Sequence, residues 1–114
     1  YIVRSGELVT AKGGSATGTK GHATALITEK FDGLVTTDAL YNLVPRRINP
    51  YYLLFLFKQP IILNQINMFT KGTIYKLIQR KDFEKIRIPR LRADLEEQIA
   101  DKMMNYLNQL QIKY

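Results

Sequence analysis

The chain has 114 residues, of which 46% are apolar, and it carries a formal net charge of +7 at pH 7. This length supports one modest hydrophobic core, so we expect a single domain, and the longest apolar run, residues 51–57, is too short to cross a bilayer. The absence of cysteine excludes disulfides and thiolate metal sites, and a single histidine, His22, excludes a two-histidine zinc site.

Strand-forming residues dominate the first part of the chain. Segments rich in Val, Thr, Leu and Ile predict β-strands at residues 7–12, 24–28 and 34–44. A glycine-rich loop, GGSATGTKG, separates the first two.

Helical signals follow at Asn49-Pro50, because asparagine caps helix N-termini and proline is tolerated at the first helical position. The residues behind it are apolar on nearly every side, which indicates a buried helix that ends before Pro60. The remaining pattern predicts a helix at residues 60–69, a short turn at 82–84, and strands at 73–78 and 86–88. Together these elements predict an α/β fold of the α+β type, with a small mixed sheet.

The C-terminal segment predicts a long helix. Asp94 is suited to cap it, and Glu96 and Glu97 fall in its first turn, where the helix dipole favours acidic side chains, so we expect both on a solvated helix end. Its apolar residues repeat at heptad spacing, at Ile99, Met103, Tyr106 and Leu110. This pattern fits both a helix packed against its own domain and a coiled-coil arm, and the sequence does not separate the two.

The glycine-rich loop is similar to a nucleotide-binding P-loop but lacks its essential features. In a P-loop the lysine directly follows the last glycine and a helix begins next, whereas Thr19 stands between Gly18 and Lys20 here and a strand follows. We therefore expect a flexible, hydroxyl-bearing loop that carries Lys12, Lys20 and His22 and is suited to contact a DNA backbone, or a plain hairpin connection.

Catalytic motifs are weak throughout. Residues 49–52, Asn-Pro-Tyr-Tyr, resemble the Asn-Pro-Pro-Tyr motif of adenine methyltransferases, but the second proline is missing and no cofactor loop precedes them. Asp32 and Asp38 are isolated in sequence, so no set of carboxylates converges as a nucleolytic metal site requires. We therefore expect no catalysis, no metal and no cofactor; a small enzyme that uses His22 is a minor alternative.

Charge divides the chain into two parts. Residues 1–93 hold 15 Lys/Arg and 6 Asp/Glu, a net charge of +9, whereas residues 94–114 hold 2 Lys/Arg and 4 Asp/Glu, a net charge of −2. A basic body attracts polyanions, which favours nucleic acid as a partner, although an inert basic surface gives the same numbers.

Three stretches, in order, resemble the target recognition domain of the specificity subunit of type I restriction-modification enzymes, a module shared with fused restriction-methylation enzymes. Residues 5–14 resemble its Gly-Asp-(Ile/Leu)-Leu strand, and residues 48–57 resemble its tyrosine-rich helix. Residues 70–103 resemble its closing signature of Gly-Thr, a strand, a turn, Ile-x-(Ile/Val)-Pro and a long helix that opens with Glu-Gln. The family usually has Pro-x-Pro before this helix, whereas Arg90-Leu91 follows Pro89 here.

The resemblance implies a non-catalytic, cytoplasmic protein of bacteria or archaea that recognises a sequence in double-stranded DNA. Residues 1–93 would be the recognition domain, and residues 94–114 a spacer and dimerisation helix. A complete specificity subunit has two recognition domains and two helices, so the chain would be a fragment of about half a subunit or less, with a recognition domain incomplete at its N-terminus. Its partners would be methylation and restriction subunits and a second recognition domain or copy, with no membrane. The alternative is a protein-interaction module with an incidentally basic surface.

Residue-level expectations follow. The helix interface would consist of Ile99, Met103, Tyr106 and Leu110. Basic and hydroxyl side chains in loops are suited to phosphate contacts, and the expected DNA-binding residues are Lys12, Lys20, His22, Arg46, Arg47, Lys71, Thr73, Lys76 and Lys81.

Overall fold

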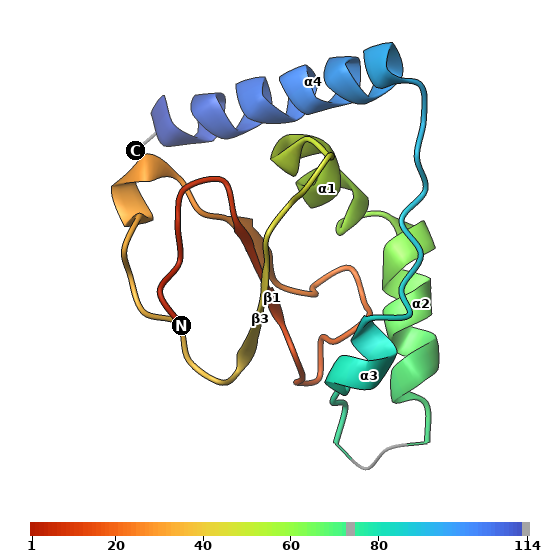
Figure 1. The fold of residues 1–114 in the computed structure, drawn as a ribbon. Helices are drawn as coiled ribbons and strands as arrows, with labels where there is room; N and C mark the ends of the chain where they lie inside the picture. The colour runs from red at the N-terminus through yellow and green to blue at the C-terminus, as the bar shows by residue number, and fades with distance from the viewer. Residues whose placement is uncertain (73–74, 113–114) are drawn as a thin grey trace.

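Three antiparallel strands form the regular sheet in residues 1–72 and 75–112, the part of the chain that the computed structural model describes (Figure 1). β1 (Leu8–Ala11) lies between β2 (Thr24–Leu26) and β3 (Leu40–Leu43). Leu8 pairs with Leu26 on one side and with Leu43 on the other, and all three leucines pack in the hydrophobic core. The expected α+β class is confirmed, while both strand pairings are antiparallel rather than mixed.

Several predicted strands are shorter than expected or are not strands. Of residues 34–44 only Leu40–Leu43 form β3, and Val35 instead forms an isolated bridge with Ile2. Within residues 75–78, Leu77 forms only an isolated bridge with Gly13. Residues 86–88 do not form a strand. At Arg87 the side-chain amide of Gln65 takes the place of a strand partner, because it accepts from the Arg87 N–H at 2.8 Å and donates to the Arg87 carbonyl at 3.0 Å.

The predicted helices at Asn49-Pro50 and Pro60 are confirmed. α1 (Pro50–Leu56) begins where the Asn49 side chain accepts from the Tyr51 N–H at 2.9 Å, and α2 (Pro60–Thr70) follows after a short link. Most of α1 is buried, as expected for a helix that is apolar on nearly every side. The predicted turn at residues 82–84 is the short helix α3 (Arg80–Phe83), and a 3₁₀ turn, η1 (Glu29–Phe31), lies between β2 and β3.

α1 lies between the sheet and α4 (Ala93–Ile112), the long C-terminal helix, which runs across it in Figure 1. Ala100 and Met103 of α4 are buried in the same core as α1 and β1. The first half of α4 therefore packs against its own domain, one of the two arrangements that the heptad pattern left open. No helix in the described ranges is long and apolar enough to cross a membrane.

A buried carboxylate fixes the start of α4. Arg90 Nε and Nη2 donate to the two carboxylate oxygens of Glu96, each at 2.8 Å, and the Leu91 N–H donates to the same group at 2.8 Å. These hydrogen bonds hold the pKa of Glu96 below its ordinary value. The expectation of a solvated Glu96 is thus wrong, since the residue is 5% exposed, and the helix begins at Ala93 rather than at a cap by Asp94.

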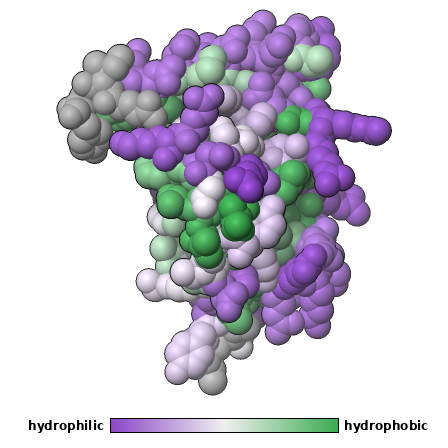
Figure 2. All heavy atoms as spheres, turned by 60° about the vertical axis from the view of Figure 1, so that its left-hand side comes forward, coloured by the Kyte–Doolittle hydropathy of each residue, from purple (hydrophilic) through white to green (hydrophobic). Residues whose placement is uncertain are grey.

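An apolar surface lies away from the helices, on the side of the N-terminus. Val3 is buried, and its N–H donates to the Leu34 carbonyl, so residues 1–3 lie along residues 34–36. Figure 2 shows apolar side chains gathered in the middle of this side of the molecule, below the hydrophilic outer surface of α4. The exposed apolar residues of these two segments include Ile2, Leu34 and Val35.

Candidate nucleic-acid interface

The glycine-rich loop between β1 and β2 is held directly against α2. Gly18 has φ +75°, and a Cβ at this position would lie 2.7 Å from the backbone nitrogen of Asn67, so no larger residue fits without moving the loop. At the start of the loop, the Gly14 N–H donates to the Lys76 carbonyl at 2.9 Å. The loop is therefore an ordered surface feature, which follows β1 and is held by contacts with α2 and with residues 75–77.

His22 is an internal support of this loop. It is 6% exposed, and its Nδ1 accepts from the Gly18 N–H at 3.2 Å. The proton of the neutral ring is thereby assigned to Nε2, which donates to Thr10 Oγ1 at 2.8 Å. Burial lowers the pKa of the ring, which favours this neutral form. The expected DNA contact through His22 is wrong for this conformation, because both ring nitrogens are already bonded.

The tip of the loop presents free backbone donors. Ser15, Ala16 and Lys20 are exposed, and their backbone N–H groups have no acceptor among the described residues. Such groups can donate to phosphate oxygens without any charge of their own. Sequence reasoning expected a flexible loop, considered only its side chains, and missed these donors.

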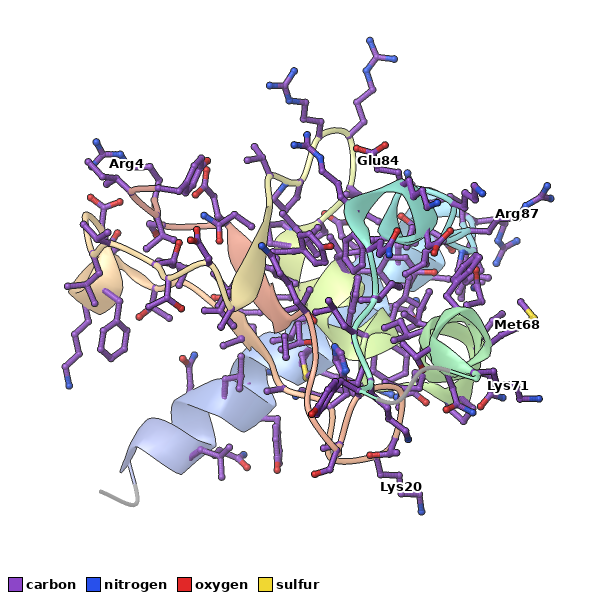
Figure 3. All side chains as sticks on the ribbon, turned by 90° about the horizontal axis from the view of Figure 1, so that it is seen from below. Arg4, Lys20, Met68, Lys71, Glu84 and Arg87 are labelled. Carbon is purple, nitrogen blue, oxygen red and sulfur yellow. The ribbon has the colours of Figure 1, made fainter. Side chains whose placement is uncertain are left out.

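Three lysines lie in or beside the loop. Lys20 lies within it, Lys71 directly follows α2 one turn beyond Asn67, and Lys76 accepts the hydrogen bond from Gly14. None of them forms an ion pair within the described ranges, and residues 8–28 and 39–81 contain no Asp or Glu at all. Figure 3 shows the Lys20 and Lys71 side chains extending away from the body. We call residues 14–21, Lys71 and Lys76 the glycine-loop face.

Other expected DNA-binding residues lie elsewhere. Arg46 lines the same groove as Glu84, and Figure 3 places Glu84 and Lys20 on opposite sides of the molecule, so Arg46 and its neighbour Arg47 do not belong to the glycine-loop face. Lys12 Nζ lies over the Tyr41 ring, 4.9 Å from its centroid. Lys81 is exposed on α3, and Thr73 is outside the described residues.

The four residues of the expected helix interface divide into two pairs. Ile99 and Met103 pack against the domain's own core, and Met103 is only 8% exposed. Tyr106 and Leu110 are 56% and 36% exposed, so only this second pair is open to a partner. The predicted continuous seam is thus interrupted, because the core uses its first half.

Among the described residues, no group of three or more His, Asp or Glu side chains is arranged to hold a metal ion. Neither a scan against models of protein families nor a search of curated proteins finds a match to this chain. The glycine-loop face is therefore interpreted from its own chemistry, which consists of unpaired cations beside free N–H donors on an ordered loop.

Proposed function

We propose that the chain binds the backbone of double-stranded DNA through the glycine-loop face. The observation that carries this proposal is the presence of Lys20, Lys71 and Lys76 beside a loop with free N–H groups, in segments without any acidic residue. Unpaired lysines attract phosphates through the release of condensed counterions, and neutral N–H donors add hydrogen bonds that fix the position of the protein on the duplex.

The order of the loop supports this function. Gly18 against Asn67 and the two hydrogen bonds of His22 hold the loop before any partner binds. A preformed loop loses less conformational entropy on binding than a flexible one, so more of the contact energy remains as affinity.

The resemblance to type I specificity subunits extends the proposal to sequence recognition. In that role the domain would direct methylation and restriction subunits to a DNA site without catalysing either reaction. Tyr106 and Leu110, the exposed half of the expected interface, would then be where α4 contacts a second recognition domain or copy. A cationic body, residues 1–93, joined to residues 94–114 of net charge −2 fits this separation of DNA contact from protein contact.

Fluorescence anisotropy with a labelled duplex tests the proposal. A Lys20→Gln/Lys71→Gln variant should bind at least tenfold more weakly than the unmodified chain in 50 mM salt, because two phosphate contacts are lost. Arg46→Gln/Arg47→Gln removes the same charge from the opposite side and serves as the matched control. Equal losses in the two variants would show that net charge alone, and not the glycine-loop face, governs binding.

A further inference from the structure

A second surface, on the side opposite Lys20, has the features of a peptide-binding groove. It has a volume of about 530 Å³ and lies between the β3–α1 connection, α1 and the segment that follows α3. Its lining is mainly apolar and includes Val44, Ile48, Phe83, Ile86 and Ile88. A DNA backbone gains nothing from such a lining, because phosphates and sugars need polar partners.

The groove runs beside an open strand edge. The Lys12 N–H donates to the Ala39 carbonyl, so in the antiparallel pairing of β1 with β3 the backbone groups of Tyr41 and Leu43 point toward β1. Those of Asn42 consequently point outward, and Val44 directly follows the end of the strand. Neither residue has a backbone hydrogen-bond partner among the described residues. Their spacing of two residues is the repeat at which an added strand forms hydrogen bonds.

The charge at this groove selects an acidic partner. Of its charged lining residues, Glu84 pairs with Arg80, and Arg90 pairs with Glu96. Arg46 is exposed and has no acidic partner within the described ranges, and Arg47 beside it is also exposed and forms no ion pair there. Two free guanidinium groups next to an apolar groove therefore favour carboxylates on whatever binds it.

We infer that this groove binds an extended peptide segment, with apolar side chains at alternate positions and at least one Asp or Glu. The segment adds to the free edge of β3 through the backbone groups of Asn42 and Val44. Its apolar side chains enter the groove, and its carboxylate pairs with Arg46, which lines the groove. This inference does not depend on DNA binding by the glycine-loop face, and it assigns the Arg46–Arg47 turn to a protein partner.

A random library of 12-residue peptides displayed on phage, selected on the full chain, tests the chemistry. The enriched peptides should combine alternating apolar residues with Asp or Glu. Arg46→Glu should weaken their binding at least tenfold, and replacing the peptide's acidic residue with Lys should restore binding to that variant. Lys20→Glu, on the other side of the molecule, is the control and should leave peptide affinity unchanged. Circular dichroism of each variant verifies that it remains folded.

Backbone methylation tests the strand geometry. N-methylation of the selected peptide should abolish binding at the two positions that face Asn42 and Val44, and not at the position between them, because only alternate N–H groups face β3. The inference is wrong if selection yields no peptides or peptides without acidic residues. It is also wrong if the charge exchange fails to restore binding, or if the loss of binding on N-methylation does not fall at positions two residues apart.

Discussion

Replacement of Gly18 by alanine tests whether the glycine-rich loop is built onto α2. The new Cβ would lie 2.7 Å from the backbone nitrogen and 2.8 Å from Cα of Asn67, both of them main-chain atoms that cannot rotate away. The loop must therefore shift, and overpacking of this kind costs about 1–3 kcal/mol. The left-handed backbone conformation of residue 18, φ +75°, adds about 1–2 kcal/mol for any residue with a Cβ.

Gly72→Ala is the matched control. Gly72 has nearly the same backbone angle, φ +79°, but nothing lies within 4 Å of the position that its Cβ would take. The two substitutions share the backbone cost and the change in the unfolded chain, so their difference isolates the contact with α2. Gly18→Ala should therefore lower the free energy of unfolding by about 1–3 kcal/mol more than Gly72→Ala does.

Urea unfolding followed by circular dichroism measures this difference. With a urea dependence of roughly 1.5 kcal/mol per M, the unfolding midpoint of Gly18→Ala should lie roughly 0.7–2 M below that of Gly72→Ala. Equal midpoints for the two variants would refute the packing of the loop against α2. The account of the glycine-loop face as an ordered surface would then fail with it.

Other predictions concern His22, Glu96 and α4. Because burial lowers the pKa of His22 below its ordinary 6.5, the unfolded chain binds the proton more readily, so stability should fall as pH drops below about 6.5. Urea titrations should show that His22→Gln removes this pH dependence. The lowered pKa of Glu96 should make stability fall again at more acidic pH, as the carboxylate protonates, and Glu96→Gln should weaken that second loss. Finally, Met103→Glu should cost at least about 2 kcal/mol of stability, because it places a charge in the core, whereas Tyr106→Glu/Leu110→Glu should leave the fold intact and abolish any self-association seen by light scattering.

Local signals predicted the elements that local chemistry determines. Asn49 and Pro50 mark the start of α1 because a cap and a proline act within one helical turn. The expected strands at residues 73–78 and 86–88 depended instead on partners distant in sequence. For Arg87 that partner is the side chain of Gln65, which no periodicity in the sequence indicates.

Site residues were predictable by type more than by position. Lysines and arginines without nearby acids were visible in the sequence, but their division between two sides depends on how β3, α1 and α2 are arranged. The burial of His22 and Glu96 likewise follows from partners that the fold supplies, namely Thr10 across the sheet and Arg90 before α4. A sequence pattern contains no direct signal for such pairs.

The salt dependence of duplex binding tests the central proposal most directly. If Lys20, Lys71 and Lys76 each neutralise a phosphate, the logarithm of the binding constant should fall with the logarithm of salt concentration at a slope of about −2.7. Affinity should then drop about 40-fold between 50 and 200 mM salt. In Lys20→Gln/Lys71→Gln the slope should fall to about −0.9, while Arg46→Gln/Arg47→Gln should keep the original slope. No binding at 50 mM salt, or a slope unchanged by loss of the two lysines, would contradict DNA binding through the glycine-loop face.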